Sequence, residues 1–335
     1  MTTHGMVYLV FGILLTIALS FDLGLLSKKN KTISIKQALM QTFFWVGLAL
    51  AFFVFLWVEG GMLAAESAGV VANEAQLPLE FLSAYLMEWS LSIDNIFVFI
   101  LIFNSFQVKE QNYSRVLLVG ILMAIVFRII FITLGVALVA KFSWILYIFG
   151  AFLVYTGYKM FTANEDEQFD PHDSKVYQFL KKFLPLVNHD GDGKYITREH
   201  GRPVYTTLFV VVVLLAAIDL VFALDSIPAV MGISKDPMII YTSNIFAVLG
   251  LRSLFFLLRG AVTKFDYLQQ GIAIVLVFIG VKMLAEHYVA EFIPKQTMVF
   301  ISLGVILVCI SGSILYSMVM NKKGTPADLK DESVN

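Results

Sequence analysis

Long apolar runs recur along this sequence, and they restrict the chain to folds that a lipid bilayer accepts. An α-helix needs roughly 20 apolar residues to cross the hydrocarbon core, and only helices or closed barrels satisfy their backbone groups there. Only 15% of the residues are charged, against about 25% in a soluble domain. We therefore expect an all-α membrane protein with about nine transmembrane helices. The predicted spans are Met6–Leu26, Ala38–Trp57, Phe81–Phe103, Val116–Val139, Trp144–Phe161, Thr206–Met231, Ile239–Arg259, Gly271–His287 and Thr297–Met320.

The charges in the connections predict how these spans are oriented. Four lysines between Lys28 and Lys36 follow the first span, whereas the second connection holds Glu59, Glu66 and Glu74 and no lysine or arginine. Cytoplasmic loops carry the excess of lysine and arginine. With nine spans, this places the N-terminus outside and the C-terminus in the cytoplasm.

Two of the predicted spans are interrupted by pairs of acids. Glu88 and Asp94 lie six residues apart in one span, and Asp219 and Asp225 have the same spacing in another. An ionised side chain at membrane depth costs several kcal/mol, so such residues usually mark a functional site. The candidate site comprises these acids and the polar residue after each second acid: Glu88, Asp94, Asn95, Asp219, Asp225 and Ser226.

The acid pairs belong to an internal repeat. With Glu88 aligned to Asp219, Arg128 matches Arg252 further along, and Leu-Val-Tyr-Thr-Gly157-Tyr-Lys-Met then matches Leu-Val-Phe-Ile-Gly280-Val-Lys-Met. Each unit holds three spans, an odd number, so the second unit must cross the membrane in the opposite sense. Inverted repeats of this kind build secondary transporters, whose sites lie near the midplane where helices are often interrupted.

The repeat predicts both the domain organisation and a local feature of the site. We expect the helices to unwind beside Asp94 and Asp225, where Pro228 also removes a backbone donor, so that both acids of a pair face one site. The predicted segments are 1–79 with two bracing spans, 80–162 with the first unit, 163–204 as a cytoplasmic loop, 205–288 with the second unit, 289–320 as the last span and 321–335 as a polar tail.

The donor types at the candidate site favour a hard cation. Carboxylates, an amide oxygen and hydroxyls suit magnesium, calcium or manganese. Arg128 and Arg252 are accessory candidates, because one acid neutralised by each would leave about two negative charges, enough for one divalent cation. Asp22 either joins the site or a proton path, or stays solvated. The single cysteine, Cys309, excludes an intramolecular disulfide and a cysteine-based zinc site.

Other interpretations of the acids remain open. Structural ion pairs with the two arginines would brace the bundle without transport. A proton-coupled carrier of a small basic solute would also place acids at membrane depth. An intramembrane aspartyl protease uses paired acids too, but the symmetric pairing of glutamate with aspartate argues against an enzyme. No permanently bound cofactor and no nucleic-acid partner are expected.

One part of the cytoplasmic loop has the spacing of a calcium-binding EF-hand. It runs from Asn188 to Glu199 and contains Asp190 and Asp192. The alternative is a Gly-Asp hairpin turn bounded by Tyr195 and Ile196. The alternative is favoured because the first ligand position is asparagine, and because a proline stands where the flanking helix would run.

The ordered motifs around the acids resemble the TerC family of bacterial membrane proteins, most of all its Alx-type members. The matching segments are Glu-Trp-Ser-Leu-Ser-Ile-Asp-Asn (88–95), Asp-Leu-Val-Phe-Ala-Leu-Asp-Ser-Ile-Pro-Ala (219–229), Tyr-Thr-Ser-Asn-Ile-Phe-Ala-Val-Leu-Gly-Leu-Arg (241–252) and Phe-Asp-Leu-Gly-Leu-Leu (21–26). The family is grouped with the LysE-type transporters. The similarity covers nearly the whole chain except the polar tail.

This resemblance implies export of manganese, or of another divalent cation, from the bacterial cytoplasm across the inner membrane. It implies that the six candidate residues form the ion path, with Asn244 as an addition. Partners would be the bilayer, the transported metal ion and protons. The alternatives are a calcium or other cation or solute antiporter, and a structural membrane protein in a metal or tellurium stress response.

Overall fold

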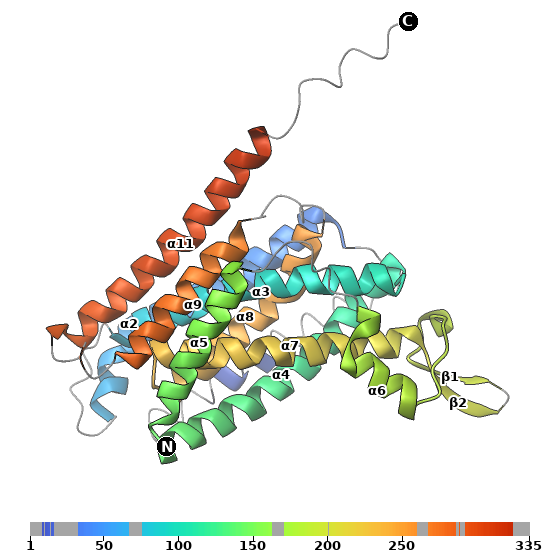
Figure 1. Cartoon of the computed structure of the whole chain (residues 1–335), viewed down its shortest axis with the longest axis horizontal. Helices are drawn as coiled ribbons and strands as arrows, with labels where there is room; N and C mark the ends of the chain where they lie inside the picture. The colour runs from blue at the N-terminus through green and yellow to red at the C-terminus, as the bar shows by residue number, and fades with distance from the viewer. Residues whose placement is uncertain are drawn as a thin grey trace, which may run out of the picture.

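The computed structural model shows a bundle of long helices with a small loop module at one end (Figure 1). It describes residues 33–66, 76–162, 171–199, 201–259, 267–285 and 292–323, with residues 9, 11–13, 15, 16 and 288. The helices of the bundle are α2 (Ile35–Glu66), α3 (Gln76–Ser105), α4 (Glu110–Lys141), α5 (Ile145–Thr162), α7 (Thr207–Ile233), α8 (Pro237–Leu258), α9 (Leu268–Leu284) and α11 (Lys295–Lys323). Most of the predicted first span and the tail after residue 323 lie outside the described residues.

The predicted spans correspond closely to these helices. Within the described part of the chain, six helices are long and apolar enough to cross a membrane: α2, α4, α5, α7, α8 and α11. Two further predicted spans are occupied by α9, which is a shorter apolar helix, and by α3, which carries the first acid pair. The protein is therefore a multi-pass membrane protein, and the count of nine spans stays a prediction.

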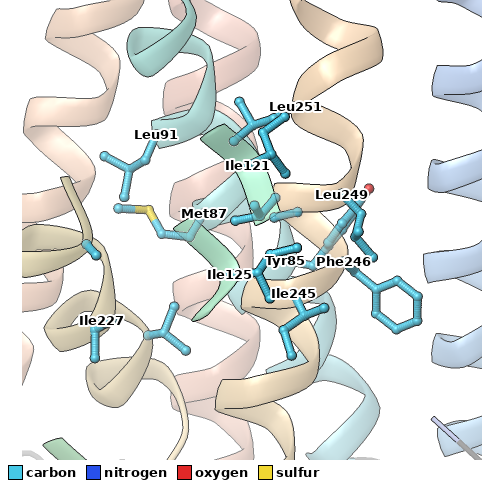
Figure 2. Close-up of a cluster of buried hydrophobic side chains, with 14 of the residues drawn as sticks. Tyr85, Met87, Leu91, Ile121, Ile125, Ile227, Ile245, Phe246, Leu249 and Leu251 are labelled. Atoms are coloured by element: carbon cyan, nitrogen blue, oxygen red, sulfur yellow. The ribbon is translucent and has the colours of Figure 1, made fainter. Parts of the chain in front are cut away.

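Four helices form the centre of the bundle, and the others surround them. α3 and α4 each pack on both α7 and α8, α5 packs mainly on α9, and α11 packs on α9 and α3. Figure 2 shows Met87 of α3, Ile125 of α4, Ile227 of α7 and Phe246 of α8 in one buried cluster. In the most apolar stretch of each helix, 94% of the residues are buried for α8 but 17% for α11. The exposed apolar faces of the outer helices suit contact with lipid.

The helices that carry the acid pairs are continuous, which corrects the expectation of unwound segments. α3 runs unbroken from Gln76 to Ser105, and α7 runs from Thr207 to Ile233 with Pro228 inside it. Unwinding would expose several backbone groups in an apolar interior, where each unsatisfied group costs several kcal/mol. The proline removes one donor only, so the continuous helix leaves fewer groups without partners.

The loop between α5 and α7 folds into a small module, and it adds two strands to a fold that was expected to be all-α. It contains the short helix α6 (Lys175–Phe183), two single turns of 3₁₀-helix (Pro171–Asp173 and Gly191–Gly193), and strands β1 (Ile196–Glu199) and β2 (Arg202–Tyr205). The strands pair antiparallel, with Ile196 opposite Tyr205. Gly201 takes a positive φ of 79° in the turn between them, a conformation that glycine adopts without strain.

In this module, two of the three acids of the EF-hand pattern, Asp190 and Glu199, are engaged with basic partners. Asp190 Oδ2 lies 2.8 Å from Lys109 Nζ, and Glu199 Oε1 lies 2.9 Å from His189 Nε2. The hydrogen bond from Lys109 lowers the pKa of the Asp190 carboxyl. A strand occupies the place of the second EF-hand helix, so the structure favours a hairpin. The strands follow the Gly191–Gly193 turn and do not flank it as expected.

Candidate functional site

The centre of the bundle holds a buried arginine that binds two acids. Arg128 projects from α4 and is 2% exposed. Its Nη1 donates to Glu88 Oε2 at 2.6 Å, and its Nε and Nη2 donate to the two carboxylate oxygens of Asp219 at 2.9 and 3.1 Å. Nη1 also donates to Asn244 Oδ1 at 2.9 Å. The rigid fork of the guanidinium thus connects α3, α4, α7 and α8.

This arrangement corrects the expected pairing of one arginine with one acid. Arg128 binds the first acid of both units, Glu88 and Asp219, because a guanidinium has five donors and reaches two carboxylates at once. With these acids ionised, the cluster keeps one negative charge. Arg252, the repeat counterpart, is also buried, at 3% exposed, on α8.

Beside this cluster, several buried oxygens have no hydrogen-bond partner among the residues that the structure describes. On α3 these are Glu88 Oε1, Ser92 Oγ and Asn95 Oδ1, and on α7 it is Ser226 Oγ. The three α3 residues follow an i, i+4, i+7 spacing and share one helix face. A buried acceptor without a partner costs about 1–3 kcal/mol. These oxygens are therefore suited to a guest that accepts lone pairs, such as a cation.

A cavity of about 400 Å³ opens next to these oxygens. Asn95, Ser226 and Arg128 contribute to its wall, together with Asp225. Thr156 of α5 donates a hydrogen bond of 3.2 Å to Asp225 Oδ1. The remaining lining residues are Leu91, Val98, Lys159, Met160, Phe222, Gln269 and Leu276. The cavity thus combines apolar walls with a small set of oxygen ligands.

The structure divides the predicted site residues into two neighbouring groups. Glu88, Asp219 and Asn244 surround Arg128, whereas Asn95, Asp225 and Ser226 line the cavity. Asp94 lies on α3, but its side chain is outside the described residues, and Asp22 is outside them as well. Among the described residues, no three His, Cys, Asp or Glu side chains are arranged to hold a metal ion. A ligand shell built from the described side chains would therefore include neutral oxygens.

Sequence reasoning missed a second polar contact between α3 and α7. Glu80, which is 4% exposed, accepts hydrogen bonds from Gln76 Nε2 on its own helix and from Ser234 Oγ at the end of α7. Thr156 was also missed. The signal at Glu80 was weak, because one acid next to the start of a predicted span is usually solvated.

A multi-pass bundle of apolar helices with a buried polar centre defines an integral membrane protein. The family model described as "Integral membrane protein TerC family" matches residues 73–325. The chain belongs to the TerC family.

Its relatives carry two kinds of name. A protein of Myxococcus xanthus, named "Uncharacterized membrane protein STKORF319", is 39% identical over 92% of this chain and 91% of its own length. Proteins named "Putative membrane-bound redox modulator Alx" are 40% identical in Photorhabdus laumondii, over 82% of this chain and 84% of the relative, and 38% identical in Escherichia coli K12, over 93% and 92%. No solved structure matches this chain significantly.

Proposed function

We propose that this protein exports a divalent cation, manganese by preference, from the bacterial cytoplasm across the inner membrane by alternating access. The observation that carries this proposal is the set of unpartnered buried oxygens on α3 and α7 next to Asp225 in the cavity. Carboxylate, amide and hydroxyl oxygens suit manganese, magnesium and calcium. Manganese is preferred on the resemblance of the motifs.

The arginine cluster explains how the buried acids are neutralised when no cation is bound. Arg128 already occupies Glu88 and Asp219 with a positive charge, so it acts as a tethered substitute for the cation. A divalent ion that enters from the cavity first meets Asp225, Asn95 and Ser226. To reach Glu88 and Asp219, the ion must displace the guanidinium, which gives the empty and loaded states different contacts.

The packing of the helices supports an inverted repeat. The second helix of each unit packs on the first helix of the other, as α4 with α7 and α8 with α3, and the third helices, α5 and α9, pack on each other. A two-fold axis between the units produces reciprocal contacts of this kind, in which each partner uses the same surface.

Two glycines at the crossing of α5 and α9 make equivalent contacts, each with a valine of the other unit. A Cβ on Gly157 would lie 2.8 Å from Cγ2 and 3.0 Å from the backbone N of Val277. A Cβ on Gly280 would lie 2.8 and 2.9 Å from the same two atoms of Val154. Each valine stands three residues before the glycine of its own unit, so the two contacts are equivalent.

We expect Gly157→Ala and Gly280→Ala to destabilise the protein by similar amounts, about 1–3 kcal/mol each, because the new methyl group meets backbone atoms that cannot move aside. Gly304→Ala on α11 is the control, since a Cβ there meets no atom within 4 Å. The measurement is the fraction of monodisperse protein left after heating in detergent. A loss in one variant with no effect in the other would argue against equivalent units.

Export against an inside-negative membrane potential needs an energy source, because each charge costs about 2.3 kcal/mol per 100 mV. Proton antiport through the same carboxylates is the proposed source, since acids exchange bound metal for protons. Calcium or another cation remains the alternative cargo, because hard oxygen sites discriminate by cavity size and ligand count.

The test is the manganese content of cells that lack their own exporters, grown with excess manganese and expressing this protein or an empty vector. We expect the protein to lower cellular manganese and to restore growth. A lower calcium content with unchanged manganese would change the cargo and keep the transporter. Unchanged contents of all divalent metals, with the protein present in the membrane, would contradict the proposal.

A further inference from the structure

The two units differ at one end of the third helix, although their sequences match there. Lys159 and Met160 lie in the last turn of α5 and line the cavity. Their repeat counterparts, Lys282 and Met283, lie in the last turn of α9, at the opposite end of the bundle. Met283 is only 4% exposed, whereas Met160 is partly exposed. In an inverted repeat, such a difference between matched positions distinguishes the open side from the closed side.

Met283 packs between α5 and α7 at its own end of the bundle. A Cβ on Gly232 of α7 would lie 2.8 Å from Met283 Sδ and 3.0 Å from its Cγ. A Cβ on Gly150 of α5 would lie 3.1 Å from Met283 Cβ. The absence of side chains on both glycines lets the methionine wedge between α5 and α7. An unbranched thioether side chain adapts readily to such a space.

A polar contact closes the same end. Ser234 at the end of α7 donates to Glu80 near the start of α3, and both side chains are buried. In the repeat alignment that pairs Glu88 with Asp219, Glu80 matches Val211 and Ser234 matches Phe103, both at the cavity end. An apolar pair cannot form a hydrogen bond, so the Glu80–Ser234 contact has no counterpart at these matched positions.

We propose that Met160 and Met283 are alternating gates that seal opposite ends of the ion path, and that the Glu80–Ser234 hydrogen bond latches the Met283 gate in the state seen here. The inference rests on the proposed alternating access. It adds which residues seal the path, and why one end is closed in this state. In the opposite state, Met160 would move into the cavity and the Glu80–Ser234 contact would separate.

The test is cysteine labelling in membrane vesicles with a charged, membrane-impermeant thiol reagent. The background is Cys309→Ser, which removes the single native cysteine. We expect Met160→Cys to react about tenfold or more faster than Met283→Cys. A thiol behind a gate reacts only in the molecules whose gate is open, so its rate falls by the ratio of closed to open molecules. Lys159→Cys and Lys282→Cys form a second pair, used if either methionine variant fails to fold.

The latch is tested by adding Ser234→Ala to each labelling variant. We expect faster reaction at Met283→Cys and slower reaction at Met160→Cys, because the population shifts toward the opposite state. Ser83→Ala is the control: Ser83 is buried on α3, but its hydroxyl donates to the carbonyl of Leu79 in its own helix. It should change neither rate.

Equal labelling of both positions in the parent protein would overturn the gate assignment. A Ser234→Ala variant that raises both rates, or changes neither, would overturn the latch. Labelling requires no manganese, so its outcome is independent of the cargo. A protein that labels as expected but leaves cellular metals unchanged would keep the gates and remove the proposed function.

Discussion

Replacing Arg128 with methionine is expected to destabilise the bundle by about 3–5 kcal/mol, because it leaves two carboxylates buried without their counter-charge. Glu88 and Asp219 are both almost fully buried, and each is bonded to the guanidinium. Breaking a buried ion pair from one side costs more than the pair contributes, since the remaining charge stays desolvated. Much of the variant should therefore be lost as aggregate on extraction.

The stability lost in this variant should be restored by neutralising the two acids as well. Arg128→Met combined with Glu88→Gln and Asp219→Asn removes all three charges together, and we expect it to recover most of the lost stability. The control is Arg115→Met on the same helix, where the side chain is exposed and donates to the carbonyl of Gly193 in the loop module. Folded protein after heating in detergent is the readout. An Arg128→Met variant as stable as Arg115→Met would show that the cluster does not brace the bundle.

Asp225→Asn is expected to reduce manganese export by about 10- to 100-fold while leaving the fold intact, because losing a coordinating group costs at least as much as losing a supporting one. Asp225 lines the cavity, and Thr156 is its hydrogen-bond donor. An asparagine oxygen accepts the same hydrogen bond, so the substitution removes the charge and keeps the shape.

A second Asp→Asn change controls for this variant. Asp236 caps the start of α8 by accepting from the backbone N of Met238, and asparagine caps helices equally well. Asp236→Asn should therefore export manganese like the parent. Both variants are compared by the initial rate of manganese loss from preloaded cells. Normal export by Asp225→Asn would make the cavity acid structural and leave the site without its charge.

The fold was predictable where the sequence signal is long and local. Runs of about 20 apolar residues identify spans on their own. The bundle helices begin and end near the predicted bounds, except that α2 continues to Glu66, beyond the predicted end at Trp57. The loop module was not predictable in the same way. Its short strands are set by tertiary contacts such as the ion pair between Lys109 and Asp190, which lie 81 positions apart in the sequence.

The site was predictable as a set of residue types, and less so as a geometry. Three of the residues that the repeat selected, Asn95, Asp225 and Ser226, line one cavity, and their role as a metal site stays a prediction. The repeat could not reveal that Arg128 binds acids from both units, since charge counting does not say which helices cross. Glu88 and Asn95 share one face of the continuous helix α3. The unwound segments were wrong, because unwinding would leave several backbone groups without partners in an apolar interior.

We propose that the buried oxygens and Asp225 form the path of a divalent cation. The most direct measurement is manganese entry into vesicles that contain the purified protein and a manganese-sensitive dye, recorded with and without a proton gradient. We predict that manganese enters these vesicles much faster than it enters protein-free vesicles, and that Asp225→Asn abolishes this entry. We also predict a faster rate when the gradient drives protons out of the vesicles while manganese enters. Entry no faster than into protein-free vesicles, with the protein folded and inserted, would contradict the account.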